Sequence, residues 1–321
     1  MHRPAALLAA LFAGIALLAS ACGAPPGAPG AAAPAAAPGA AAGDAGGRIA
    51  VMSPSAAETL VELGVTPRIV AVGDFVDWPP ELARLPKIGA FDAPNAERLV
   101  ELGVTQLFTA ASEAGRGEHD RLVGLGIEVV ALDTSTFAGT LAAIAETGRR
   151  VGRASEARQL LDRIAARIAE VRQRAATVPR RRVLVAVGHD PLFVAGPGSH
   201  LDELVTIAGG ENVAHDAASP YPMIALEAIL VRAPEVIVDS ADNRPGHSRG
   251  MQAGFWAAWP FLPAVAESRV AVVDPWQLLV PGPRLADMAE LMGRLVHPEV
   301  FGAPRPEDFG GAPRPAEDAG R

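Results

Sequence analysis

The sequence has only one cysteine. The aromatic residues Phe, Trp and Tyr make up 5% of the chain and include a single tyrosine. Because Cys22 is the only cysteine, no disulfide can form within the chain, and no cysteine-based metal cluster can be built. The seven histidines include no His-x-x-x-His pair. The spacing therefore predicts no metal site and no cofactor of the protein's own.

Motifs of common enzyme classes are also missing. The sequence has no Gly-x-Ser-x-Gly elbow, and Gly196-Pro-Gly-Ser199 lacks the Gly-Lys-Ser/Thr ending of a phosphate loop. Ser199, His200 and Asp202 are neighbours in sequence, which does not make them a catalytic triad. The net charge is −8 and the one basic block is Arg180–Arg182, so nucleic acid is not an expected partner. We expect a binding protein and no enzyme.

The first 21 residues have the pattern of a secretion signal. Arg3 is followed by an apolar run from Ala5 to Leu18, interrupted only by Gly14, and small residues precede Cys22. These small residues resemble the lipobox of bacterial lipoproteins, which implies that Cys22 is lipidated and that the protein is exported and anchored to a membrane. The alternative is an ordinary cleaved signal ending in Ala-Ser-Ala.

Two further segments are unlike a folded domain. Residues 22–47 are almost entirely Ala, Pro and Gly, which predicts a flexible tether. Residues 304–321 combine Pro, Gly and mixed charge, and we expect a disordered tail. The roughly 250 residues between them are enough for two lobes with cores of their own.

One pattern occurs twice, 130 residues apart. Asn95–Phe108 and Ala225–Val238 each combine a short amphipathic helix, a turn and an apolar strand, with Glu97 and Glu227 at the same step. Such a duplication predicts two similar α/β lobes, each of which presents one carboxylate.

The pattern of apolar segments predicts Rossmann-like lobes at 48–153 and 180–303, with mainly parallel strands. In the first lobe, Ser55 and Glu58 have the spacing of a capping box at a helix start, and Gly64 is a stop signal. Between the lobes, residues 154–179 carry the longest helical pattern in the chain. A single long helix that joins the lobes implies a stiff connection.

Six segments resemble, in order and spacing, the periplasmic binding proteins of ABC importers for vitamin B12, haem and ferric siderophores, and most of all the vitamin B12-binding members. The segments are Arg48-Ile-Ala-Val-Met-Ser-Pro-Ser-Ala-Ala-Glu58, Val72-Gly-Asp-Phe-Val-Asp-Trp-Pro-Pro80, Pro86-Lys-Ile-Gly89, Asn95-Ala-Glu-Arg98, Gly209-Gly-Glu-Asn-Val213 and Pro281-Gly-Pro-Arg284. The resemblance covers residues 48 to about 301.

The resemblance implies a groove between the lobes that binds cobalamin or a related corrinoid. Aromatic faces suit a broad, largely apolar ring system, and no protein ligand to cobalt is required. The matching positions, with a nearby arginine, are Phe75, Phe91, Phe193, Tyr221, Trp276 and Arg284.

The same resemblance implies that Glu97 and Glu227, one per lobe, dock on an ABC permease and its ATPase. Alternatively, each glutamate only complements the dipole of its helix, worth about 0.3–1 kcal/mol. Haem and ferric siderophores are the alternative ligands. A surface protein that sequesters metal chelates is the alternative function, and a monomer is expected.

Overall fold

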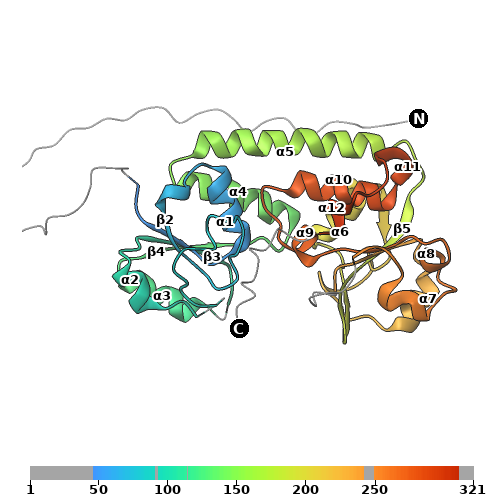
Figure 1. Ribbon diagram of the computed structural model, residues 1–321, viewed down its shortest axis with the longest axis horizontal. Coiled ribbons are helices and arrows are strands. Elements are labelled where there is room, and N and C mark those ends of the chain that lie inside the picture. The colour runs from blue at the N-terminus through green and yellow to red at the C-terminus, as the bar shows by residue number, and fades with distance from the viewer. Residues whose placement is uncertain (1–45, 91–92, 114, 242–248, 311–321) are drawn as a thin grey trace, which may run out of the picture. The chain divides into compact units, whose positions relative to one another are not determined.

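The computed structural model describes residues 46–90, 93–113, 115–241 and 249–310. The expected secretion signal, Cys22 and most of the tether lie outside the described residues. Two α/β lobes form between residues 46 and 310, and a long helix runs beside both of them (Figure 1). The predicted fold class is therefore confirmed.

The N-terminal lobe contains a parallel sheet of four strands in the order β2-β1-β3-β4. The strands are β1 (Ile49–Val51), β2 (Ile69–Val72), β3 (Gln106–Ala110) and β4 (Glu128–Leu132). The helices are α1 (Pro54–Glu62), η1 (Thr66–Arg68), α2 (Ala96–Glu101), α3 (Arg116–Gly124) and α4 (Phe137–Arg150). β1 is fully buried, as expected for a central strand of a parallel sheet covered on both faces.

The C-terminal lobe contains a mixed sheet in the order β6-β5-β8-β10-β9, with β7 also paired to β5. Its strands are β5 (Arg181–His189), β6 (Leu192–Val194), β7 (Gly210–Asn212), β8 (Val236–Asp239), β9 (Gly250–Met251) and β10 (Val270–Val272). Only the β5–β6 and β9–β10 pairs are antiparallel among the described strands. The helices are α6 (His200–Ile207), α7 (Leu226–Arg232), η2 (Gly254–Ala258), α8 (Pro263–Ala266), α9 (Pro275–Leu279), α10 (Leu285–Val296), α11 (Pro298–Phe301) and α12 (Pro306–Phe309).

The sequence repeat corresponds to a structural repeat. α2 leads to β3 in one lobe, and α7 leads to β8 in the other. Each helix is followed, at the equivalent position of the repeat, by a residue in the left-handed conformation. These residues are Gly103 with φ 63° and Ala233 with φ 44°. Alanine in this conformation costs roughly 1–2 kcal/mol more than glycine, so the second copy keeps the turn without the residue that favours it.

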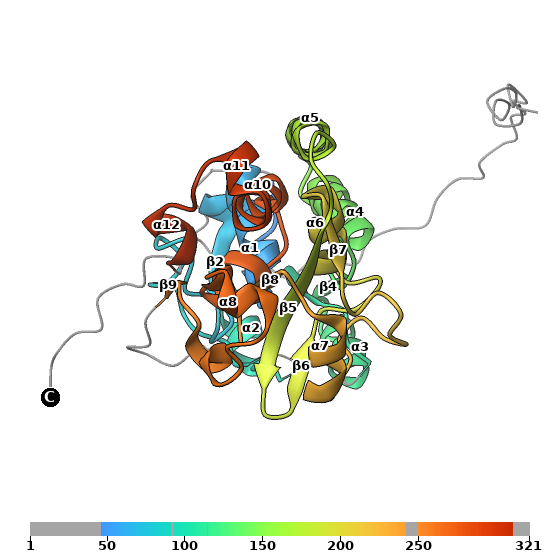
Figure 2. The same ribbon diagram turned by 90° about the vertical axis from the view of Figure 1, so that its right-hand side faces the viewer.

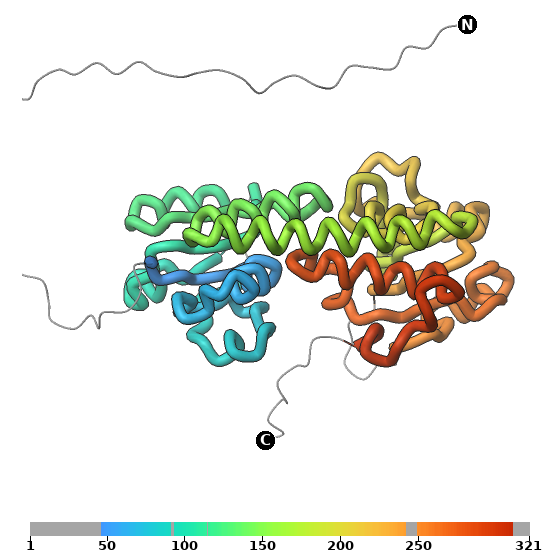
Figure 3. Tube along the Cα trace, turned by 90° about the horizontal axis from the view of Figure 1, so that it is seen from above, coloured from blue at the N-terminus to red at the C-terminus, as the bar shows by residue number. Residues whose placement is uncertain are grey.

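The expected linking helix is α5 (Ala154–Ala175), which is 22 residues long and ends four residues before the expected limit at 179. Its buried face packs against α4 of the first lobe and α10 of the second, as Figure 3 shows from above. One continuous hydrophobic cluster includes residues from both lobes and from α5. In the described part of the chain, no helix is long and apolar enough to cross a membrane.

The predicted capping box at α1 is wrong. Ser53 caps the helix by accepting a hydrogen bond from the Ala56 amide at 3.4 Å. The Ser55 hydroxyl instead donates to the Pro281 carbonyl of the other lobe, and Glu58 forms an ion pair with Arg284. The spacing fits a capping box, but contacts between the lobes occupy both side chains.

Part of the segment predicted to be a disordered tail is folded. Residues 306–309 form α12, in which Phe309 is 8% exposed and packs on the main cluster. The Asp308 carboxylate accepts hydrogen bonds from two nitrogens of Arg294 at 2.7 and 2.8 Å. These contacts fix a segment whose composition alone indicates disorder.

The pair of Glu58 and Arg284 gives a stability prediction. The Glu58 side chain is 4% exposed and the Arg284 side chain 23% exposed. Arg284→Met would leave a buried carboxylate without its partner, so we expect a loss of roughly 3 kcal/mol in the free energy of unfolding at pH 7. The double variant Glu58→Leu/Arg284→Met should recover most of that loss, as measured by urea unfolding.

The stability loss of the Arg284→Met variant should also depend on pH. Burial raises the pKa of Glu58, opposed by Arg284, so removal of Arg284 leaves only the raising effect. A carboxyl group with a raised pKa in the folded state costs stability above that pKa and ceases to do so once protonated. The Arg284→Met deficit should therefore shrink as the pH falls. The control Arg163→Met breaks an exposed pair with Glu62 and should cost less than about 1 kcal/mol; an equal loss in both variants would contradict the prediction.

Candidate functional site

The carboxyl ends of strands from both sheets meet at the boundary between the lobes. α1 follows β1 directly, and the segment from α9 to Arg284 follows β10. The contacts of Ser55 with Pro281 and of Glu58 with Arg284 join these two segments. Ligands of open α/β sheets bind outside the carboxyl ends of the strands, so this boundary is the candidate site.

Arg284 holds Trp276 and the N-terminal lobe together. Its Nε lies 2.9 and 3.1 Å from the two Glu58 carboxylate oxygens, and its Nη2 donates to the Trp276 carbonyl at 3.1 Å. The guanidinium carbon is 5.4 Å from the centre of the Trp276 ring. Direct contact between Arg284 and a ligand stays a prediction, because the structure gives its guanidinium a positioning role.

Trp276 belongs to a helix. It lies in the first turn of α9, where its amide donates to the Asp274 carboxylate at 2.8 Å. Asp274 is 5% exposed and forms an ion pair with Arg249 at 2.7 Å. The Asp-Pro-Trp sequence thus starts a helix and leaves the indole half-buried.

Phe193 and Tyr221 share a row of exposed side chains. Residues 222–224 run antiparallel to β6, with Phe193 opposite Met223. Phe193 and Met223 lie directly opposite each other, so their side chains point to the same side, and Tyr221 precedes Met223 by two residues. Tyr221, Met223 and Phe193 are 37%, 67% and 38% exposed. The structure therefore brings two of the predicted ligand-binding aromatics together and adds a methionine that the sequence did not indicate.

His200 connects this row to α9. Its Nε2 lies 2.8 Å from the Leu278 carbonyl, which can only accept, so Nε2 carries the hydrogen. Nδ1 is then an acceptor, and the Tyr221 hydroxyl donates to it at 3.3 Å. His200 is 3% exposed, and burial lowers its pKa. A buried neutral imidazole thus ties Tyr221 to the helix that carries Trp276.

The remaining aromatics belong to the N-terminal lobe. Phe75 follows β2 and is 52% exposed. Lys87 fixes its loop, because the ammonium donates to the Val76 carbonyl at 2.9 Å and pairs with Asp77 at 3.0 Å. Phe91 lies outside the described residues. The role of Phe75 in ligand binding stays a prediction.

A second polar cluster lies at the carboxyl ends of β5 and β8. The buried Asp239 carboxylate accepts the Trp256 indole N–H at 2.9 Å and lies 2.9 and 3.0 Å from His189 Nε2. The His189 ring stacks on Phe255 at 4.1 Å between centroids. The sequence analysis missed this cluster, although an aspartate directly after the apolar run Val236–Val238 is a signal for a strand end.

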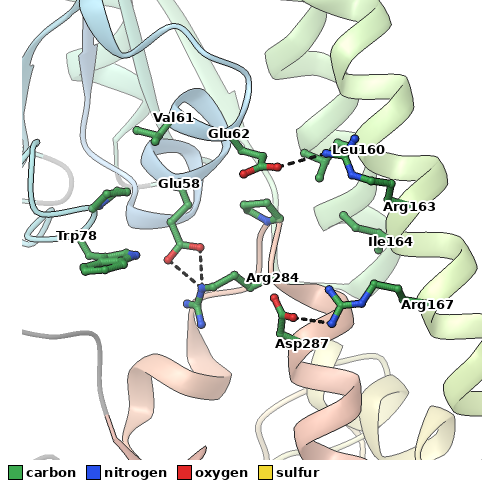
Figure 4. A pocket seen from close by; sticks show the side chains of 12 residues that line it. Glu58, Val61, Glu62, Trp78, Leu160, Arg163, Ile164, Arg167, Arg284 and Asp287 are labelled. Carbon is green, nitrogen blue, oxygen red and sulfur yellow. Dashed lines mark hydrogen bonds and ion pairs between the residues drawn. The ribbon is translucent and has the colours of Figure 1, made fainter. Parts of the chain in front are cut away.

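A cavity of about 330 Å³ lies between α1, α5 and α10, and Figure 4 shows the side chains that line it. Ion pairs border it: Glu58 with Arg284, Glu62 with Arg163, and Asp287 with Arg167. Each cation lining the cavity already has a carboxylate partner. These ion pairs connect the elements around the cavity, and they leave no lining cation free to bind a charged ligand.

Glu97 and Glu227 are both exposed and lie in the first turns of α2 and α7. Asn95 caps α2 by accepting the Arg98 amide at 2.9 Å, whereas the Ala225 side chain makes no such bond at α7. Among the residues with described placement, neither glutamate has an ion-pair partner. α2 and α7 lie on the side of the molecule away from α5 (Figures 1 and 2).

Comparison with known families gives a decisive match. Residues 49–275 match the family described as periplasmic binding protein. The chain belongs to this periplasmic binding protein family. The vitamin B12-binding protein of Salmonella typhimurium strain LT2 is 32% identical over 195 residues, which are 60% of this chain and 71% of that protein.

Solved structures of periplasmic binding proteins show the same fold. The periplasmic vitamin B12 binding protein BtuF of Vibrio cholerae has a TM-score of 0.65 at 24% identity, over 78% of this chain and 96% of that one. The haem-binding protein HutB of Vibrio cholerae has a TM-score of 0.69 at 21% identity, over 78% and 99%. By name, these two proteins bind vitamin B12 and haem.

No group of three or more His, Cys, Asp or Glu side chains that could hold a metal ion occurs within the described ranges. His247 and Arg244 lie outside these ranges.

His200 gives a prediction on pH. A histidine whose pKa is lower in the folded state than its ordinary value of 6.5 contributes stability above that value, and this contribution is lost as the pH falls. His200→Gln has no such titration, so its urea midpoint should fall less than that of the wild type between pH 7.5 and 5. His215→Gln, at an exposed histidine, is the control. An unchanged pH dependence in His200→Gln would contradict a buried neutral imidazole.

Proposed function

We propose that the protein captures cobalamin or a related corrinoid between its lobes and delivers it to an ABC permease. The observation that supports this most directly is the exposed row of Phe193, Met223 and Tyr221 beside the Trp276 helix. An apolar ring system binds well to aromatic and thioether side chains, because both offer polarisable surface. The 32% identity to a vitamin B12-binding protein supports the same ligand class.

Haem is the second candidate, since haem-binding proteins share the fold. The observation that favours it is the hydroxyl of Tyr221 next to a buried imidazole acceptor, as oxygen ligands suit ferric iron. However, burial raises the pKa of Tyr221, which opposes formation of the phenolate. Cobalamin requires no such ionisation, and we therefore prefer it.

For delivery, we propose export, lipid anchoring through Cys22 and a tether over residues 22–47 that lets a monomer reach its permease. The unpaired carboxylates of Glu97 and Glu227 would bind cationic side chains, one on each half of the permease. Their position on one side of the molecule supports a single partner that contacts both lobes.

Ligand titration tests the proposed cargo. A soluble form that starts near Gly47 would be titrated with cyanocobalamin, haemin and ferric chelates, followed by absorbance and tryptophan fluorescence. We expect saturable cyanocobalamin binding, weakened about tenfold or more by Tyr221→Ala and by Trp276→Ala, because each removes an aromatic contact. Phe261→Ala, at an exposed phenylalanine of the C-terminal lobe, should bind as the wild type does.

Full affinity in the Tyr221→Ala/Trp276→Ala double variant would show that the groove assignment is wrong. Saturation with haemin alone would favour the second candidate instead.

Charge reversal tests docking. Glu97→Lys/Glu227→Lys should abolish cyanocobalamin uptake by cells that carry it in place of the wild type, because two attractive contacts become repulsive. Ligand affinity of the purified variant should be unchanged. Glu170→Lys/Glu211→Lys makes the same change in charge at other exposed positions and should transport normally. Persistent uptake in the first variant would show that these glutamates are not docking points.

A further inference from the structure

Each glutamate-bearing helix also exposes an apolar side chain one turn further on. In α2, Val100 follows Glu97 by three residues and is 52% exposed. In α7, Val231 follows Glu227 by four residues and is 87% exposed. Residues three or four apart lie on the same side of a helix, so each carboxylate has an exposed valine beside it.

More apolar surface lies at the same end of each lobe. In the N-terminal lobe, α3 packs into the same hydrophobic cluster as α2, and its Val123 and the adjoining Leu125 are 57% and 50% exposed. In the C-terminal lobe, Phe261 is 65% exposed and precedes α8. α8 is held to the end of α7, because the Ala264 amide donates to the Pro234 carbonyl at 3.0 Å.

These side chains are not needed for the fold. Val100 and Val231 are absent from the hydrophobic clusters of the described residues. Other residues of the same helices, Leu99 and Ile229, are fully buried and supply the packing. Val100 and Val231 are not equivalent positions of the repeat, but in each lobe an exposed apolar side chain lies next to an exposed carboxylate. Exposed apolar side chains beside a charge are typical of a surface that contacts a partner.

We propose that Glu97 with Val100 and Glu227 with Val231 form two composite docking contacts, extended by Val123, Leu125 and Phe261. The partner is the permease, so this inference rests on the proposed function. It assigns to each half of that partner a cationic side chain with an apolar side chain next to it. The carboxylate steers and orients the encounter, and the valine supplies buried apolar area that lengthens the life of the complex.

The test uses cells in which Val100→Ser/Val231→Ser replaces the wild-type protein. We expect the initial rate of radiolabelled cyanocobalamin uptake to fall at least fivefold, because the polar variant loses the apolar part of both contacts. Overproduction of the variant should restore much of the rate by mass action. Val100→Ile/Val231→Ile keeps the surface apolar and should transport as the wild type does. Met251→Ser, at an exposed residue of β9, is the control for loss of an apolar side chain elsewhere.

The outcomes separate this inference from the function on which it rests. If the wild type supports uptake and the double serine variant is equally fast, the apolar contacts are refuted and the proposed function stands. If uptake does not depend on the wild-type protein, the proposed function fails. The purified serine variant must bind cyanocobalamin as tightly as the wild type; weaker binding would assign the valines to the groove and overturn the docking role.

Discussion

The ion pair between Glu58 and Arg284 is the contact on which the candidate site depends. It joins α1, which follows the central strand of one lobe, to the segment that carries Trp276 in the other. The Ser55 hydroxyl adds a second contact across the same boundary. Together with the apolar face of α5, these contacts set the distance between the two surfaces that we propose face the ligand. Recognition in this protein therefore depends on how the lobes are fixed, as well as on the side chains that they present.

Two surfaces with different chemistry follow from this arrangement. The boundary of the lobes offers aromatic side chains held by buried polar groups, such as Tyr221 by His200. The helices α2 and α7, on the side away from α5, offer exposed carboxylates with valines beside them. The first surface suits a small ligand with a broad apolar face, and the second suits a large partner with two similar halves. The duplicated helix–strand unit produces the second surface without a separate docking domain.

Local sequence patterns predicted the helices and strands, because these depend mainly on residues close together in sequence. The repeat identified α2 with β3 and α7 with β8, and the apolar spacing identified α5 almost to its ends. Contacts between distant residues could not be predicted in this way. Ser55 and Glu58 fit a capping box, yet their partners lie 226 residues further along the chain. The helix at Trp276 and the pair of Asp308 with Arg294 likewise depend on buried partners that composition does not reveal.

The hydrophobic cluster that continues from one lobe through α5 into the other also concerns folding. On the side that faces α5, the two sheets share one hydrophobic cluster, because residues of both lobes pack in it. A cut within α5 would leave each half with an exposed part of the shared interior. The shared interior therefore couples the stability of the two lobes, although each lobe contains a complete sheet and a smaller hydrophobic cluster of its own.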